Sequence, residues 1–200
     1  MDMKKFLSLT IVLLLVMYTS ASAQLFKPKE KKPAEAAYQA DTVPVENKRI
    51  VFRETISLPG KSADEIMRQA KAWYSERFVK PTVISTKEID KGSCNIFEAV
   101  VEEYIVFKKR FFVLNRARIY YYLTITSTDG ACEASISRIT YWHDDESPDG
   151  GMRYNAEELI TDENALKDGM LRKFQGKFRT KTIDLKTTLF GELRQRLTSN

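Results

Sequence analysis

Few side chains of this 200-residue chain have the types and the spacing that catalysis requires. His143 is the only histidine, so a Ser-His-Asp or Cys-His arrangement would have to use it. It follows Trp142 at the predicted end of a strand, without a nucleophile elbow or a nearby cysteine, and we expect a surface histidine. Cys94 and Cys132 are too well separated to form a zinc site with it. We therefore expect no catalytic residue, no metal and no cofactor.

Acidic residues suggest two further chemistries. Counted from Asp145, the loop 144–151 has oxygen ligands at the first, third and fifth positions and a glycine at the sixth, as an EF-hand calcium loop does. The twelfth position is Ala156 instead of glutamate, so a solvated turn is the favoured interpretation. Glu102 and Glu103 form a carboxylate pair, but adjacent strand residues point to opposite faces and cannot converge as glycosidase chemistry requires.

Tyrosines on one face of a predicted sheet offer binding chemistry instead. Apolar residues alternate with tyrosine and threonine over residues 119–126, which is typical of a half-buried strand. Asp129-Gly130 is a strong hairpin signal, and a second strand is expected from Ala131 to about Trp142.

The two-residue turn fixes the register of this hairpin, because it pairs Thr128 with Ala131. Apolar residues then meet on the buried side, Leu123 with Ile136 and Ile125 with Ala134. On the open face the same register places Tyr122 beside Ser137, Tyr120 beside Ile139 and Arg118 beside Tyr141. This patch is the candidate ligand site, because tyrosine rings stack on sugars, lipids and peptides. Tyrosine is also a good strand former without any ligand, and that interpretation stays open. The candidate residues are Arg118, Tyr120, Tyr122, Ile139 and Tyr141.

A second surface feature is the basic and aromatic connection Lys108-Lys109-Arg110-Phe111-Phe112. Lysine and arginine beside phenylalanine are typical of an element that touches a membrane surface or binds an anion. The alternative is a hairpin whose phenylalanines fold inward. The candidate residues for an anion or membrane surface are Lys108, Lys109 and Arg110.

The N-terminus predicts export. Lys4 and Lys5 precede an apolar run over residues 6–17, and Ala21-Ser22-Ala23 presents small residues two apart before Gln24. We expect residues 1–23 to be a signal peptide that is removed, and the protein to reach the periplasm or the extracellular space. The apolar run is shorter than the roughly 20 residues of a transmembrane helix, so no membrane span is expected after cleavage.

Export changes what the formal net charge of +5 implies. A basic cytoplasmic chain would suggest nucleic acid, whereas outside the cytoplasm the acidic partners are lipid headgroups, lipopolysaccharide, polysaccharide or another protein. We expect no nucleic-acid partner. The alternative interpretation is that the charged residues serve only to keep the domain soluble.

A disulfide between Cys94 and Cys132 would suit an exported chain. The predicted strand order places a third strand between those that carry them, about 10 Å apart, which exceeds the roughly 7 Å limit for a bridge. The oxidation state stays open.

The elements expected around these residues describe one α+β domain. Residues 24–47 contain three prolines and several lysines without apolar periodicity, which indicates a disordered leader. Ser62-Ala63-Asp64-Glu65 forms a capping box that begins a helix. The remaining expected elements are strands over 49–58, 82–87, 94–107, 119–126 and 131–142, a loop over 143–165 and an amphipathic helix over 181–197.

Several segments of the chain together resemble those of a known family. They are Pro59-Gly60-Lys61-Ser62-Ala63-Asp64-Glu65, Trp73, Asp129-Gly130, and Lys181-Thr182-Ile183-Asp184 before Leu189-Phe190. On these segments the chain is similar, over roughly residues 48–199, to the exported Bacteroidetes family catalogued as domain of unknown function 4468. The resemblance implies a TBP-like fold, a curved antiparallel sheet of about five strands with two helices on one face, in the order β-α-β-β-β-β-α. It implies no catalytic residues.

The predicted function is therefore an exported, non-catalytic binding or interaction module that uses the open aromatic face of its sheet. The alternatives are a hydrolytic enzyme acting on envelope glycans or lipids, and a structural subunit of an envelope assembly. A deep pocket with converging carboxylates favours the enzyme, a broad aromatic face favours the binding module, and a stable oligomer favours the subunit.

Overall fold

Among the described residues, seven strands form one antiparallel sheet in the order β1-β2-β6-β5-β4-β3, and β7 pairs with β6. The computed structural model describes residues 35–80, 83–89, 92, 95–110 and 113–199. The chain divides into the units Met1–Lys32 and Pro33–Asn200, and the fold belongs to the second. The strands are β1 (Val45–Glu46), β2 (Arg49–Ser57), β3 (Val83–Ile89), β4 (Ile96–Arg110), β5 (Val113–Thr128), β6 (Ala131–His143) and β7 (Met152–Asn155).

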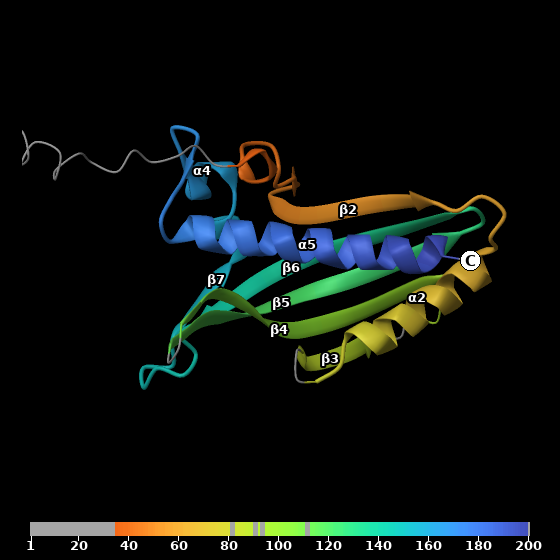
Figure 1. The fold of residues 1–200 in the computed structure, drawn as a ribbon, viewed down its shortest axis with the longest axis horizontal. Helices are drawn as coiled ribbons and strands as arrows, with labels where there is room; N and C mark the ends of the chain where they lie inside the picture. Colours follow the sequence, from red (N-terminus) through yellow and green to blue (C-terminus); the bar gives the residue numbers. More distant parts are fainter. Residues whose placement is uncertain (1–34, 81–82, 90–91, 93–94, 111–112, 200) are drawn as a thin grey trace, which may run out of the picture. The chain divides into compact units, whose positions relative to one another are not determined.

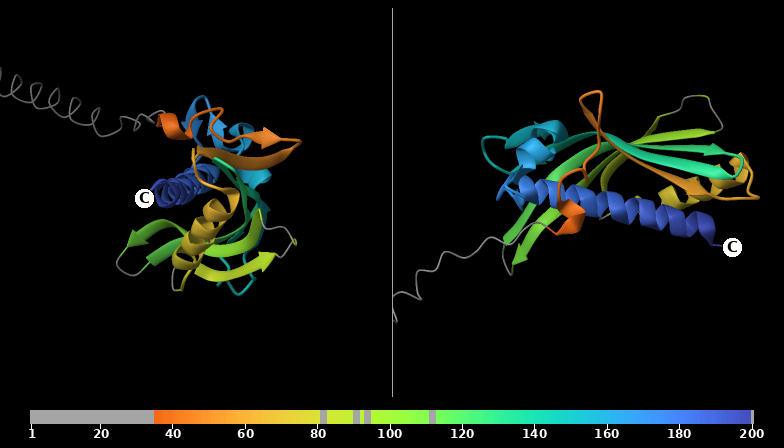
Figure 2. Two further views of the ribbon diagram at one scale, coloured as in Figure 1. Left: turned by 90° about the vertical axis from the view of Figure 1, so that its right-hand side faces the viewer. Right: turned by 90° about the horizontal axis from the view of Figure 1, so that it is seen from above.

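Two long helices, α2 (Ala63–Arg77) and α5 (Gln175–Thr198), lie on the same face of this sheet (Figures 1 and 2). We call this the helix side, and the opposite side the outer face. No helix of the described chain is long and apolar enough to cross a membrane. The smaller elements are η1 (Ala36–Tyr38), α3 (Ala156–Leu159), α4 (Asp162–Ala165) and the pair β8 (Leu166–Lys167) and β9 (Met170–Leu171).

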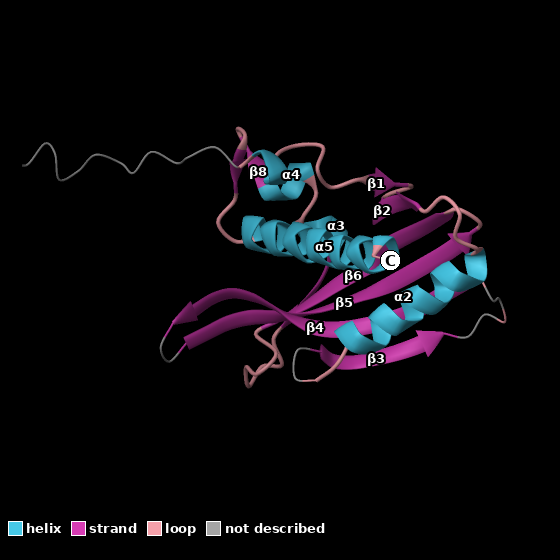
Figure 3. Cartoon of the chain, turned by 45° about the vertical axis from the view of Figure 1, so that its right-hand side comes forward, coloured by secondary structure: helices cyan, strands magenta, loops and turns pink. Residues whose placement is uncertain are grey.

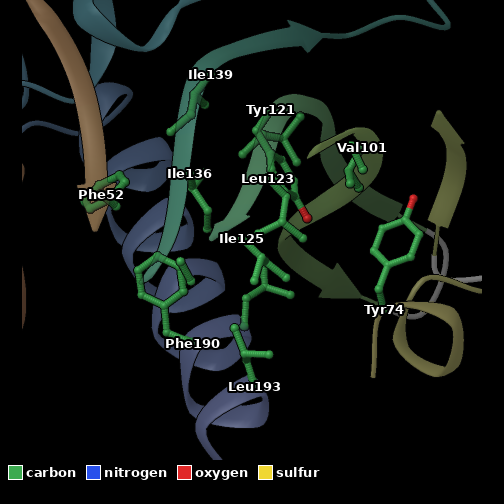
Figure 4. Packing of buried hydrophobic residues seen from close by; sticks show 14 of the residues in the cluster. Phe52, Tyr74, Val101, Tyr121, Leu123, Ile125, Ile136, Ile139, Phe190 and Leu193 are labelled. Atoms are coloured by element: carbon green, nitrogen blue, oxygen red, sulfur yellow. The ribbon is translucent and has the colours of Figure 1, made fainter. Parts of the chain in front are cut away.

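The core lies between the sheet and the two helices. Every second residue of β5 from Ile119 to Ile125 is fully buried, as a period of two along a one-sided strand requires. Phe190 and Leu193 of α5 pack on this layer, and Tyr74 of α2 closes it near β4 (Figure 4). The predicted architecture of about five strands with two helices on one face is confirmed, and the short strands β1 and β7 extend it at the edge.

The predicted hairpin of β5 and β6 is confirmed in its first half. Leu123 pairs with Ile136 and Ile125 with Ala134, as the alternation predicts. The turn that fixes this register contains Gly130, whose φ of 81° lies in the left-handed region that glycine adopts at low cost.

Beyond Ser137 the predicted register is wrong. Tyr122 pairs with Ser137 but Tyr120 pairs with Thr140, so β6 holds one extra residue, a β-bulge at Arg138 and Ile139. Arg138 has a φ of 51°, a conformation usual for glycine at such bulges. The extra residue reverses the side to which every later residue of β6 points. Ile139 and Tyr141, predicted on the open face, are consequently each 1% exposed in the core.

The predicted capping of α2 is confirmed for Ser62, whose hydroxyl accepts from the Glu65 amide at 3.3 Å. The Glu65 carboxylate accepts from the Gln69 side chain at 3.2 Å. Glu54 lies on the apolar face of β2, between Phe52 and Ile56, and its carboxylate forms an ion pair with Arg194 of α5 at 2.7 Å.

The prediction of a disordered leader over 24–47 is wrong for residues 35–47, which pack on the domain. Arg179 of α5 is fully buried and donates to the carbonyl oxygens of Tyr38 at 2.9 Å and Ile160 at 2.7 Å. It also pairs with Asp162 at 2.8 Å, and Val43 is buried beside the core. The rest of the predicted leader and the predicted signal peptide lie outside the described residues.

Two further boundaries differ from the predictions. The expected loop 143–165 contains β7, α3 and α4, and a capping box of Asn155 and Glu158 begins α3. α5 begins at Gln175, six residues before the predicted Lys181. Gly176 and the threonines nearby lower helix propensity, and the burial of Phe178 overrides them.

The predicted strand order around the cysteines is confirmed, because β5 lies between β4 and β6. Cys132 is a free, buried cysteine, and burial raises the pKa of its thiol to about 11. Cys94 lies outside the described residues.

Candidate functional site

The outer face carries three of the five residues predicted for ligand binding. Arg118, Tyr120 and Tyr122 alternate along β5 and are half-buried on this face. The structure brings these three together and places the other two predicted residues in the core.

Aromatic rings and arginines alternate across four strands of the outer face. Tyr104 of β4 pairs with Arg118 of β5, Arg118 with Trp142 of β6, and Trp142 with Arg153 of β7. The Arg118 guanidinium lies 4.9 Å from the Trp142 ring, and the Arg153 guanidinium lies 4.0 Å from it. Arg116 lies 3.8 Å from the Tyr104 ring. Such cation–π contacts orient the guanidinium groups and leave their N–H edges able to donate.

Arg118 is held on both sides by carboxylates. It donates to Glu102 at 3.1 Å and to Asp145 of the loop after β6. Burial opposes ionisation of Glu102, but hydrogen bonds from Tyr120, Ser85 and Arg118 outweigh it and lower the pKa of this carboxyl. Arg118 is therefore neutralised by its neighbours and fixes the row in place.

Tyr122 supports a different arginine. The guanidinium of Arg138, at the bulge, lies 4.7 Å from the Tyr122 ring. The ring is therefore partly covered by a cation, and a ligand approaching here meets arginine as well as tyrosine. The sequence interpretation of a bare aromatic stacking surface needs this correction.

A hollow of about 610 Å³ opens beside Arg138, where β6 changes its partner from β2 to β7. Val51 of β2 pairs with Ser137, and Asn155 of β7 pairs with Thr140, so the two bulge residues face the gap between those strands. The volume falls within the range of small-ligand sites. We call this site the outer-face hollow, and it is lined by Arg49, Val51, Ser137, Arg138, Ile139, Thr140, Asn155 and Glu157.

The hollow is polar and carries two arginines that lack acidic partners. Arg49 and Arg138 are exposed, and no carboxylate of the described residues forms an ion pair with either. Glu157 is the one carboxylate among the described residues that line the hollow, and its Oε1 accepts from the Ile50 amide at 3.0 Å. Hydroxyl and amide groups of Ser137, Thr140 and Asn155 complete a lining suited to a hydroxyl-rich, acidic ligand.

Sequence reasoning missed Tyr104, Trp142, Arg138 and Arg49. Tyr104 could have been found, because it is two residues after Glu102 and shares its face. Arg138 and Trp142 required knowledge of the bulge, and Arg49 required the pairing of β2 with β6.

The predicted anion or membrane surface lies at the end of β4. Lys108 is exposed, and Lys109 and Arg110 pair with Leu114 and Val113 of β5. Phe111 and Phe112 lie outside the described residues. The hairpin of β4 and β5 extends past the part of the sheet that the helices cover (Figure 3).

Two other candidates have a different environment from the one predicted. His143 is half-buried against the rings of Phe174 at 5.5 Å and Phe178 at 5.8 Å, so the surface interpretation is wrong. In the acidic loop, Asp145 pairs with Arg118 and Glu146 pairs with Arg116 at 2.5 Å. These carboxylates organise the outer-face arginines.

The chain is similar to a family of undetermined function. Residues 52–142 match the family described as "Domain of unknown function (DUF4468) with TBP-like fold". This segment spans β2 to β6 and contains most of the outer face. No curated protein shows significant similarity to the chain.

Two solved structures share the fold. A DUF4468 family protein from Bacteroides ovatus aligns with a TM-score of 0.74 and 26% identity, covering 84% of this chain and 98% of the other. A TBP-like protein from Parabacteroides distasonis aligns with a TM-score of 0.65 and 18% identity, covering 78% and 97%. Both similarities extend over most of the described domain.

Proposed function

We propose that this chain, whose residues 52–142 match the DUF4468 family with a TBP-like fold, is an exported, non-catalytic domain that binds an acidic glycan in the outer-face hollow. The observation that carries the proposal is the pair Arg49 and Arg138 in a polar hollow, neither of which forms an ion pair with a carboxylate of the described residues. A guanidinium donates to a carboxylate through two parallel N–H groups, and the hydroxyls beside it match sugar hydroxyls.

The bulge gives the hollow its specificity for an acidic ligand. Arg138 is placed by an uncommon backbone conformation and stacks on Tyr122, so its direction is set before a ligand arrives. Pre-ordered side chains lose less entropy on binding. Tyr120 and Tyr122, the sequence-predicted residues, therefore support the site from the adjoining strand.

The alternative to a binding module is a hydrolytic enzyme. The lining of the hollow favours binding over hydrolysis. Glycosidases of the usual kind place two carboxyl groups on either side of the scissile bond. Among the described residues that line the hollow, Glu157 stands alone, and the Ile50 amide already uses one of its oxygens. A chromatogram of the glycan after prolonged incubation separates the two functions, because shortened products would establish an enzyme.

The binding test compares acidic and neutral glycans of equal length by calorimetry. Uronic-acid oligomers are expected to bind, and neutral glucose oligomers are expected to bind at least tenfold more weakly. The double variant Arg49→Ser, Arg138→Gly should lose tenfold or more in affinity, because each hydrogen bond to a charged group contributes about 1.5–3 kcal/mol.

Arg53→Ser is the matched control, because Arg53 lies on the same face of β2 but is already paired with Glu46 and Glu133. It should change the affinity by less than twofold. Equal binding of neutral and acidic oligomers, or an unaffected double variant, contradicts the proposal.

Export has its own test. When the full chain is expressed in a secretion-competent host, the exported protein should begin at Gln24, as measured by intact mass and N-terminal sequencing. A product that keeps residues 1–23 would contradict the export proposal and leave the ligand proposal standing.

A further inference from the structure

A second cavity, of about 350 Å³, lies beside the first turns of α5 and shares no residue with the outer-face hollow. Its lining has an apolar part from β4, β9 and α5, and a basic part from the segment 172–181. We call it the basic pocket. The proposed function does not use it.

The apolar part is built from Phe107, Leu171 and Gly176. Phe107 is the extra residue of a bulge in β4, and its ring packs against Phe178 with centroids 4.7 Å apart. A Cβ on Gly176 would lie 2.8 Å from the Leu171 Cβ, so glycine allows Leu171 to approach the helix this closely. An apolar surface is thereby held at the base of α5.

The basic part carries four cations, and no carboxylate is among the described residues that line the pocket. Lys173 and Lys177 are exposed and form no ion pair with any described residue. Arg172 donates to the Leu166 carbonyl at 3.2 Å, and Lys181 lies 3.5 Å from Asp184. The positive field of the two lysines therefore remains available to a ligand.

The backbone at the start of α5 adds little to this field. The amide of Gly176 already donates to the Arg172 carbonyl at 2.9 Å, and that of Lys177 donates to the Phe174 carbonyl at 3.1 Å. Attraction for an anion at this place consequently comes from the side chains. Exposed Lys108, next to Phe107 on β4, extends the basic surface.

We infer that the basic pocket seats the headgroup of an anionic phospholipid, with the glycerol and the first acyl carbons against Phe107 and Leu171. The apolar base distinguishes this ligand from a free phosphate, which would gain nothing from it. The exposed lysines face a membrane surface that carries many headgroups, and each lysine near such a surface contributes about fivefold to binding. The β4–β5 hairpin, which extends past the helices, would lie along the same surface (Figure 3).

The experiment measures sedimentation of the full chain with vesicles of phosphatidylglycerol or of phosphatidylcholine. Neutral vesicles report the apolar contribution of the N-terminal segment, and its charge cancels between variants because all of them keep that segment. We expect at least tenfold stronger binding to the anionic vesicles, and a loss of tenfold or more of that binding in the variant Lys173→Glu, Lys177→Glu. The variant Lys173→Gln, Lys177→Gln should show a smaller loss of the same kind.

Lys80→Glu, Lys87→Glu is the matched control, because both lysines are exposed and the change in net charge is identical. It should retain binding within twofold. Thermal unfolding of every variant should match that of the parent, because none of the four lysines forms an ion pair with a described residue.

Competition by glycerol phosphate distinguishes a phospholipid headgroup from a soluble phosphate as the ligand. At millimolar concentration it should compete weakly, since it lacks the apolar part. Full competition would show that the pocket takes a soluble phosphate, and equal losses in both glutamate variants would show a general charge effect. Either result, or unchanged binding in all variants, overturns the inference.

Discussion

The two halves of β6 are held in different ways. Residues 131–137 lie between β2 and β5 in an unbroken register, and their inward side chains meet apolar partners such as Leu123. Residues 140–143 lie between β5 and β7, and on their outer face Trp142 takes part in the row of rings and arginines. The bulge at Arg138 separates the halves.

The difference shows how a single extra residue creates a site. In the first half the period of two determines which side chains are buried, and the alternation on the outer face continues without a break. At the bulge the sheet changes partner, opens the outer-face hollow and exposes a guanidinium. A regular strand would have covered the same place with a continuous ladder.

Removal of Arg138 should have the largest effect on this arrangement. The deletion leaves Ser137, Ile139, Thr140 and Tyr141 in regular alternation, so Ile139 and Tyr141 keep their buried side while the bulge and its guanidinium are lost. We expect the affinity for uronic-acid oligomers to fall by tenfold or more, measured by calorimetry, because the outer-face hollow closes. Arg138→Ala keeps the bulge and loses only the guanidinium, so its affinity should fall less. A deletion variant that binds like the parent would show that the bulge does not form the hollow.

Truncation in the regular half should have the next largest effect. Leu123→Ala leaves a cavity at a position that is fully buried opposite Ile136, and should cost about 2–5 kcal/mol of unfolding free energy. Thr124→Ala, one residue along on the outer face, should change it by less than about 0.5 kcal/mol. Similar losses for the two variants would contradict the assignment of faces.

Low pH should reduce the stability of the sheet near the bulge, because Glu102 of β4 becomes protonated. Its folded pKa lies below the value of the unfolded chain, so its contribution to stability is present above the unfolded pKa and is lost as pH falls through the folded one. The urea midpoint between pH 7 and pH 2 should therefore fall less steeply in Glu102→Gln. Glu133→Gln, which alters an exposed pair with Arg53, should keep the parent's acid profile.

The smallest effect is expected from Arg138→Gly. A left-handed residue other than glycine is strained by about 1–2 kcal/mol, and the extra chain entropy of glycine offsets about half of this. We expect a gain of about 0.5 kcal/mol, seen as a small rise in the thermal midpoint. A fall in the midpoint would mean that the stacking of Arg138 on Tyr122 outweighs the strain.

Much of the fold was predictable because its signals are local. The cap at Ser62, the Asp129-Gly130 turn and the alternation along β5 depend on neighbours in sequence, and the structure confirms each of them. The order of strands and the single helix-covered face followed from these signals and the family resemblance. The structured part of the predicted leader was missed, because its anchor is Arg179, far away in the chain.

The candidate site was predictable only in part. Periodicity placed Tyr120 and Tyr122 on the correct face. The same periodicity placed Ile139 and Tyr141 on the wrong face. No residue type near Arg138 predicts a bulge, because arginine occupies the position with positive φ where glycine is usual. The hollow also needs Arg49 and Asn155, which reach it through strand pairing over long separations in sequence.

The sequence by itself determined the class of fold, the buried face of β5 and the first half of the β5–β6 register, because strand alternation and turn chemistry act between neighbouring residues. Only the tertiary structure decided where that register breaks, which arginines form no ion pair with a described carboxylate, and where cavities open. These features depend on which distant strands pair along each stretch of β6 and on how the helices pack against the sheet.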